Sequence, residues 1–341
     1  MTTVAEPTPE GPEDGPFFDD LHVGLRCETA PAMTLSSGNA ALHQAILGDR
    51  LRLALDARLG PQVTGQPGVP AHPALVWDVA IGQSTLLTRR VRANLFYRGL
   101  AFRRFPRLGD TLRTTTEVVA LRQNQPRQSR AATGMAVLRV ATTDQEGRPV
   151  LDFWRCAMLP LSDPHGDTGH ADGFDGIPST LDDRAVTQAI DGWKLGPVAS
   201  SADQPRFADL KLGRRWRLTT GDVVSSAPEL ARLTLNVAAA HHDRTIAGDR
   251  LVYGGHTIGI AASHLARLFP TLVTVTAWHS CEHTAPVHEG DTLFSEVVLE
   301  QTQPLPGIGG LVHLRSMVHA VPAGGREPAQ VLDWRLVAVV A

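Results

Sequence analysis

The segment from Leu235 to Gly259 concentrates side chains that can move protons. It contains four of them: His241, His242, Asp243 and His256. A histidine ring has a reference pKa of about 6.5, so it can act as both base and acid near neutral pH. Gly254 and Gly255 precede a stretch with helical spacing, and backbone N–H groups at a helix start attract negative charge. The segment is therefore a candidate reaction centre, with a metal site or an ordinary polar loop as alternatives.

A second polar cluster tests the metal alternative. His279, Cys281 and His283 alternate along one predicted strand face, and their nitrogen and sulfur atoms are zinc ligands by type. Residues two apart on a strand are about 6.5 to 7 Å apart, which is too far for all three to bind one ion easily. We therefore expect no metal and no cofactor, and we interpret these residues as the polar lining of a cleft near the helix start.

An internal repeat shows which elements position the first cluster. The frame Phe-x-Asp-Leu-x-x-Gly occurs at Phe18 and again at Phe207, and Ser36-Ser37 returns at Ser225-Ser226. Gly109-Asp-Thr-Leu112 recurs as Gly290-Asp-Thr-Leu293, and Val150-Leu-Asp as Val331-Leu-Asp. Four matches in one order indicate a tandem duplication.

The same elements are predicted in both copies. Helical spacing covers 40–53 and 74–88 in the first copy, and 227–240 and 257–268 in the second. Alternating, β-branched runs follow as three strands per copy, at 110–121, 131–142 and 150–159, then at 291–300, 310–320 and 331–340. We therefore predict an α+β tandem (double) hotdog, in which each antiparallel sheet wraps around a central helix.

The predicted boundaries follow from composition. Residues 1–15 are acidic and Pro-rich, which indicates a disordered tail. We assign 16–161 to the N-terminal hotdog and 206–341 to the C-terminal hotdog. Residues 162–205 are rich in Gly, Asp and Pro, which is typical of a linker, with a short helix expected around 181–190.

The second copy resembles the MaoC-like (R)-hydratase and dehydratase family. The resemblance lies in Asn236 to Asp243, in the turn and helix from Tyr253, and in Ala285 to Leu293. The family pattern is DxNPxHxD, a His-Gly turn, and a Pro-Val-x-x-Gly-Asp-Thr-Leu hairpin. Length, duplicated layout and Arg250 to His256 resemble its mesaconyl-CoA hydratase (β-methylmalyl-CoA dehydratase) branch.

Position by position, the resemblance implies a modified catalytic motif. The family's catalytic Asp falls on Asn236 and its His on His241, while its final Asp is kept as Asp243. His241 is then the expected acid and base, and the Asn236 side-chain carbonyl, at the end of a helix, is expected to hold the water. Asp243 either orients His241 or caps the next segment. His242 has no place in the motif, and we expect it to be structural.

The resemblance also implies groups that bind the substrate. Tyr253, Gly254, Gly255 and His256 are expected to bind the oxyanion or the substrate: the glycine N–H groups stabilise the oxyanion of an acyl-CoA thioester, and His256 donates to that oxyanion or to another part of the substrate. Arginines are candidates for a substrate carboxylate or the CoA phosphates, namely Arg244, Arg250, Arg103 and Arg104.

The first copy is a control for these assignments. At the repeat offset, Asn236 corresponds to Leu47 and His241 to Arg52, which cannot perform the same proton chemistry. We therefore expect an active second half and a degenerate first half.

The whole sequence limits the class of partner and location. A net charge of −3 with interspersed signs lacks the basic surface that nucleic-acid binding requires. No apolar run approaches a membrane span, and the three cysteines are an odd, widely spaced set. We expect a cytoplasmic protein that binds neither nucleic acid nor membrane, and a homodimer is the assembly we consider.

These features favour a lyase that reversibly hydrates a short enoyl-CoA, with mesaconyl-CoA, β-methylmalyl-CoA or another dicarboxylic acyl-CoA as candidate substrates. Two alternatives stay open. A hotdog acyl-CoA thioesterase would use the same turn, and a catalytically silent acyl-CoA-binding module would account for an Asn in place of the Asp.

Overall fold

The computed structural model describes residues 15–125, 131–199, 206–247, 250–323, 325 and 327–341. The first 14 residues of the predicted tail lie outside the described residues. We call 16–161 the first half and 206–341 the second half.

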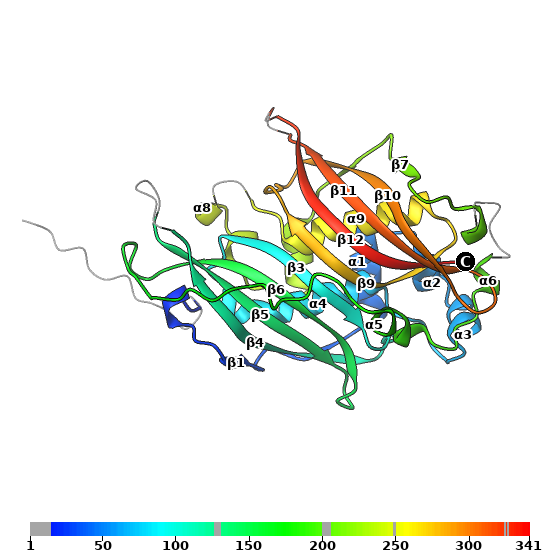
Figure 1. Cartoon of the computed structure of the whole chain (residues 1–341), viewed down its shortest axis with the longest axis horizontal. Helices are drawn as coiled ribbons and strands as arrows, with labels where there is room; N and C mark the ends of the chain where they lie inside the picture. The colour runs from blue at the N-terminus through cyan, green and yellow to red at the C-terminus, as the bar shows by residue number, and fades with distance from the viewer. Residues whose placement is uncertain (1–14, 126–130, 200–205, 248–249, 324, 326) are drawn as a thin grey trace, which may run out of the picture.

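Both halves have the same order of helices and long strands (Figure 1). The first half contains η1 (Phe18–Asp20), β1 (Arg26–Cys27), β2 (Met33–Thr34), α1 (Ser37–Leu47), α2 (Arg52–Leu55), α3 (Leu59–Thr64), α4 (Pro73–Gln83), η2 (Ser84–Thr88), β3 (Ala93–Phe102), β4 (Thr111–Gln123), β5 (Thr133–Thr143) and β6 (Pro149–Pro160). The connection contains α5 (Asp183–Thr187), η3 (Gln188–Ile190) and α6 (Gly196–Ala199). The second half contains η4 (Phe207–Asp209), β7 (Arg215–Arg217), β8 (Asp222–Val223), α7 (Ala227–Leu233), η5 (Ala239–His241), α8 (Arg244–Ala247), α9 (Gly254–Leu268), β9 (Leu272–His283), β10 (Thr292–Pro304), β11 (Gly310–Val321) and β12 (Ala329–Val340).

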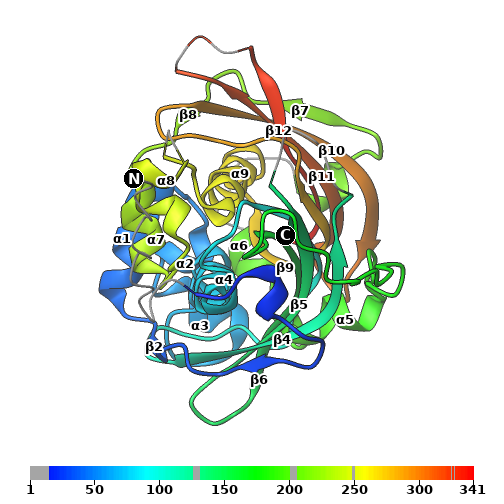
Figure 2. The same cartoon turned by 90° about the vertical axis from the view of Figure 1, so that its left-hand side faces the viewer.

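One antiparallel sheet runs through both halves. Its long strands lie in the order β4-β5-β6-β3-β9-β12-β11-β10, so each half contributes four consecutive strands. The halves join where β3 pairs with β9, with Tyr97 opposite Cys281 and Leu100 opposite Trp278. The sheet curves around α4 and α9, which lie side by side inside it (Figure 2). The predicted double hotdog is confirmed.

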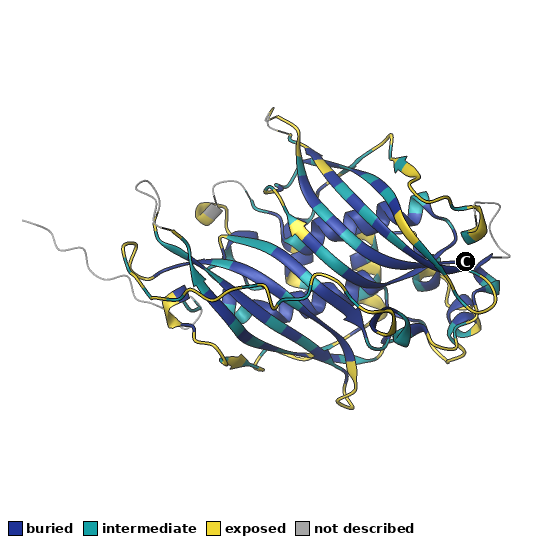
Figure 3. Ribbon diagram, viewed as in Figure 1, coloured by how far each residue is buried: buried dark blue, intermediate teal, exposed yellow. Residues whose placement is uncertain are grey.

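The core fills the space between the sheet and these two helices. Every residue of α4 is buried, and most of α9 is buried as well (Figure 3). Strand β4 alternates between buried and partly exposed positions, as expected for a sheet with one covered face. Where α4 meets the second half, Trp77 packs edge-on against Trp278 with ring centroids 4.8 Å apart.

The sequence prediction missed β3, and of β9 it recognised only the strand face over 279–283. The first seven positions of β9 are all buried, so that part shows no alternation by which a strand could be recognised. Strand β3 is similarly buried along its second half and includes Gly99 at a positive φ of 59°.

The predicted helix over 227–240 is interrupted. Helix α7 ends at Leu233, and the chain re-enters a short 3-10 turn, η5, only at Ala239. The break matters because it contains Asn236, which the sequence analysis placed at a helix end.

The connection between the halves packs against the first half's sheet. Phe174 and Ile177 cover an apolar cluster on its outer face that includes Phe96 and Cys156. Arg122 stacks over the Phe174 ring at 4.1 Å, and the predicted short helix is present as α5 and η3. In the part of the chain that is described, no helix has the length and apolar character to cross a membrane.

Candidate active site

A cavity of about 340 Å³ lies between the two halves and contains the predicted centre. The first half lines it with Ile81, with Arg155 and with residues around the start of β3. The second half contributes Asn236, His241, the residues from Leu251 to Gly254, Thr257, and the residues from His283 to Val287. The site is therefore shared, although its predicted reacting groups come from the second half.

His241 is held in the form that can act as a base. Its side chain is 9% exposed, and Nδ1 donates to the Leu251 carbonyl oxygen at 2.9 Å. Since a carbonyl can only accept, the proton lies on Nδ1 and Nε2 keeps its lone pair. Burial lowers the pKa of His241 to about 4, despite the opposing hydrogen bond to Leu251. The ring is neutral at physiological pH.

Asn236 lies in a strained turn that the first half supports. The preceding Leu235 has a φ of 60°, which a bulky side chain rarely adopts. Gly82 of α4 allows the close approach, because a Cβ there would overlap the Thr234 carbonyl oxygen. The Val237 N–H then donates to Thr85 Oγ1 at 3.0 Å. Packing between the halves thus fixes the position of Asn236.

The Asn236 side chain corrects one expectation. Its Oδ1 accepts from the Ala238 N–H at 2.9 Å, so the amide oxygen is engaged in a local turn instead of facing a water. Among the described residues its Nδ2 has no hydrogen-bond partner, and Asn236 borders both this cavity and a second pocket next to His242. His242 Nε2 donates to the Asn236 carbonyl oxygen at 2.7 Å, a contact that holds the backbone turn.

Two roles were predicted for Asp243, and the structure shows that it caps the next segment, α8, and does not orient His241. The side chain is exposed, and Oδ1 accepts from both the N–H and the Oγ1 of Thr245, at 2.8 and 2.7 Å. These bonds lower the pKa of Asp243. It does not line the cavity, and the Leu251 carbonyl, instead of Asp243, orients His241.

Only some of the four residues predicted to bind the oxyanion or the substrate at the start of helix α9 line the cavity. Tyr253 and Gly254 line it, but Gly255 and His256 do not. Gly255 packs against Asp78 and the Tyr253 ring, where a Cβ would not fit. His256 is fully buried with neither ring nitrogen bonded, and burial lowers its pKa to about 3. The expected substrate contact through the His256 side chain is therefore corrected.

Buried polar contacts tie Tyr253 to the first half. Its hydroxyl donates to Asp78 Oδ1 at 3.0 Å, and the other Asp78 carboxylate oxygen lies 3.1 Å from His43 Nε2. Asp78 and His43 come from α4 and α1, so the cavity wall at Tyr253 depends on the first half.

The candidate metal cluster does not assemble in the described residues. His283 lines the cavity and packs against Gly254, whereas His279 pairs with His313, with their ring nitrogens 3.1 Å apart. Within these same residues, no group of three or more suitable side chains could hold a metal ion. His283 is instead a cavity residue whose Nε2 is unbonded and whose pKa burial lowers to about 4.

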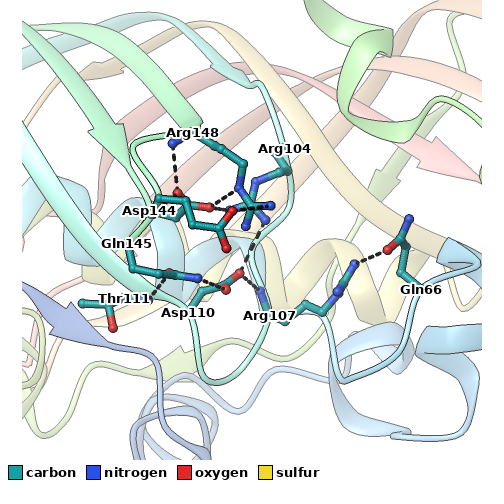
Figure 4. A network of polar contacts seen from close by, with 9 residues as sticks. Gln66, Arg104, Arg107, Asp110, Thr111, Asp144, Gln145 and Arg148 are labelled. Atoms are coloured by element: carbon teal, nitrogen blue, oxygen red, sulfur yellow. Dashed lines mark hydrogen bonds and ion pairs between the residues drawn. The ribbon is translucent and has the colours of Figure 1, made fainter.

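The four predicted arginines lie outside the cavity lining. Arg103 donates to Asp152 at 2.6 Å, and Arg250 pairs with Glu289. Arg104 pairs with Asp144 and Asp110 in a network around the β5–β6 turn (Figure 4). Arg244 is exposed on α8. Arg244 and Arg250 therefore do not reach a substrate carboxylate inside this cavity, whereas a role of Arg103 or Arg104 at the CoA phosphates stays a prediction.

The cavity instead contains an arginine that the sequence analysis did not single out, Arg155 of β6. It is 3% exposed and is surrounded by neutral hydrogen-bond acceptors. No sequence motif marks it, because Arg155 stands within an apolar strand where its direction depends on register.

Two proteins of known function are similar to this chain over more than nine-tenths of its length. No family model matches the sequence. The β-methylmalyl-CoA dehydratase of Chloroflexus aurantiacus is 27% identical, with 94% of this chain and 95% of that protein aligned. The mesaconyl-CoA hydratase of Cereibacter sphaeroides is 26% identical over 92% and 91% of the two chains.

Two solved structures are also similar to this chain over most of its length. A conserved Mycobacterium tuberculosis protein, described as having a double hotdog fold and as essential for bacterial survival during infection, is 52% identical. The alignment covers 96% of this chain and 98% of that one, with a TM-score of 0.89. A putative MaoC domain dehydratase from Chloroflexus aurantiacus is 24% identical over 96% and 98% of the chains, with a TM-score of 0.85.

Proposed function

Because the chain belongs to the MaoC-like hydratase and dehydratase family with a double hotdog fold, we propose that it reversibly hydrates a short enoyl-CoA. The main support is His241, a neutral imidazole with a free Nε2, in a cavity that also contains the Asn236 amide and the start of α9. The cavity volume of about 340 Å³ is near the low end for ligand pockets, which favours a small acyl group.

The proposed reaction uses His241 twice. Asn236 Nδ2 donates to a water, and His241 Nε2 removes a proton from it while the water oxygen bonds to the β-carbon of the enoyl thioester. The π electrons move onto the thioester oxygen, which we place at the Gly254 end of α9, where the positive end of the helix dipole stabilises it. The proton on Nε2 then passes to the α-carbon, so that one water has been added. A ring with a pKa of about 4 gives up this proton readily.

A dicarboxylic acyl-CoA is the finer proposal. The two curated relatives are named for mesaconyl-CoA and for β-methylmalyl-CoA, whose acyl groups bear a second carboxylate. Arg92, exposed beside the cavity, is the cation that we assign to the CoA phosphates. We also propose that the protein is cytoplasmic and that it forms a homodimer. Sedimentation of the purified protein tests the homodimer.

The alternatives predict different products from one assay. Crotonyl-CoA and mesaconyl-CoA are each followed by loss of enoyl-thioester absorbance and by release of free thiol, with His241→Ala alongside. Absorbance loss without thiol, absent in the variant, is the expected result. Thiol release identifies a thioesterase, although no Asp or Glu lines the cavity to serve one. Binding of both thioesters without either reaction identifies a silent module.

A further inference from the structure

Arg155 places a buried positive charge at the cavity wall. Its Nε donates to Asn94 Oδ1 at 2.8 Å, and its two terminal nitrogens donate to Ser84 Oγ at 2.8 Å and Thr88 Oγ1 at 2.9 Å. A guanidinium has five N–H donors, so one N–H remains on each terminal nitrogen. Two parallel N–H groups are the arrangement that binds a carboxylate through both oxygens.

The described residues provide no negative partner for this charge. The ionisable groups around Arg155 are Tyr97, Tyr253, Cys156 and His241. Burial raises the pKa of the first three, that of Cys156 to about 12, and lowers the pKa of His241 to about 4. All four are neutral at pH 7. Arg103, Arg104, Arg250 and Arg315, by contrast, each contact an Asp or Glu.

An unpaired buried charge is costly, and proteins normally supply a counter-ion or hydrogen bonds to the whole group. Desolvation lowers the pKa of Arg155, which expresses this cost. The equivalent position in the second half, at the repeat offset, is Leu336, a fully buried apolar residue. The fold therefore does not require an arginine at this position. The positive charge is a feature of the first half alone, and it lies at the cavity.

We propose that Arg155 binds a free carboxylate on the acyl group of the substrate and so determines specificity. The substrate class is an α,β-unsaturated thioester with a second, anionic carboxylate, and this inference rests on the proposed function. A CoA phosphate is a poorer candidate, because the guanidinium is buried among Tyr97, Asn94 and Thr88 instead of lying at the exposed rim with Arg92. The first half, which lacks the acid/base groups, thus selects the acyl group that the second half hydrates.

The first experiment measures kcat/KM for mesaconyl-CoA and for crotonyl-CoA with the full chain. Arg155→Gln is expected to lower the value for mesaconyl-CoA by about 100-fold, since a charged hydrogen-bonded pair is lost, and to change that for crotonyl-CoA less than about threefold. Arg155→Lys, which keeps the charge but not the two-pronged geometry, is expected to lie between. Arg103→Gln is the matched control outside the cavity, because Asp152 keeps its contact with Arg139. Circular dichroism checks that each variant folds.

A binding experiment separates failure of this inference from failure of the proposed function. Succinyl-CoA and butyryl-CoA cannot be hydrated, and their dissociation constants are measured by calorimetry on wild type and Arg155→Gln. Tighter binding of succinyl-CoA, lost in the variant, supports the carboxylate site even if neither enoyl-CoA is turned over. Equal affinity of wild type for the two thioesters, or an equal loss for both in the variant, overturns it.

Discussion

At the scale of single residues, the site depends on an amide where the family pattern has a carboxylate. Asn236 cannot accept a proton from water, so the proposed chemistry places both proton transfers on His241 and leaves Asn236 to position the water through Nδ2. Bonded through Nδ1 to Leu251, His241 keeps the Nε2 lone pair free to take the proton of the water. Its lowered pKa makes it a weaker base in that step, but it makes the protonated ring a strong acid for proton transfer to the α-carbon.

Substitution of Asn236 separates positioning from proton transfer. Asn236→Asp keeps the acceptor for the Ala238 N–H, and we expect it to fold and to keep or raise the rate of hydration. Asn236→Ala loses both the turn acceptor and the donor, and a decrease of about 10- to 100-fold in kcat is expected. Steady-state kinetics with melting temperatures measure both. Full activity in Asn236→Ala would show that the amide does not hold the water.

The pH profile tests the state of His241. The neutral ring is the active form, so a pKa near 4 keeps activity on the acid side of neutrality. Between pH 8 and pH 5.5 we expect kcat/KM to stay nearly constant, whereas a histidine with the reference pKa would lose about tenfold by pH 5.5. A profile that falls with a midpoint near 6.5 contradicts the buried, neutral assignment.

At the scale of elements, the turn between α7 and η5 is positioned by a helix of the other half. The strained Leu235 backbone persists because Thr234 to Val237 rest on α4 at Gly82 and on η2 at Thr85. A glycine in the last turn of a buried helix thus supports a site whose predicted reacting groups all belong to the second half.

Gly82→Ala is predicted to damage both stability and activity. The new Cβ would overlap the Thr234 carbonyl, and the forced shift is expected to cost about 1–3 kcal/mol of unfolding free energy and to displace Asn236. Gly38→Ala is the control, because the nearest atom to its added Cβ is 3.6 Å away. Urea unfolding and hydration rates are compared for the two variants. Equal behaviour would mean that α4 does not position the turn.

An element could be predicted from the sequence where its burial leaves a periodic pattern of polar and apolar residues. Strands with one exposed face, such as β4 and β10, alternate in polarity and were predicted close to their observed bounds. Strand β3 and the fully buried start of β9 were missed, and so was the break after Leu233, because an Ala-rich run reads as continued helix. His241 and Gly254 were found through their motif. His283 was predicted to line a cleft near the helix start, and it does line the cavity, whereas His279 and Cys281 do not. Arg155 reaches the cavity through strand register and contact between the halves, which local sequence does not encode.

At the scale of the whole molecule, the two halves share one sheet and one core. The β3–β9 pairing joins the sheets, and Trp77 of the first half packs against Trp278 and Trp334 of the second. The cavity lies along this same junction, so the first half contributes to the site as part of its wall and its support.

The shared core predicts cooperative unfolding. Urea titrations followed by tryptophan fluorescence and by far-ultraviolet circular dichroism should give a single, coincident transition. Trp77→Ala is expected to lower the free energy of unfolding by about 3–5 kcal/mol while the two probes still coincide. Separate transitions for the two probes would show that the halves fold independently.

In the proposed reaction, water adds to an enoyl-CoA through His241. Mass spectrometry of the product formed from crotonyl-CoA or mesaconyl-CoA in D2O tests it most directly. Wild type is predicted to give a 3-hydroxyacyl-CoA with one non-exchangeable deuterium at the α-carbon and no free CoA, while His241→Ala leaves the enoyl thioester unchanged. Unlabelled substrate recovered from wild type, free CoA with the carboxylic acid, or an equally labelled product from His241→Ala would contradict the claim.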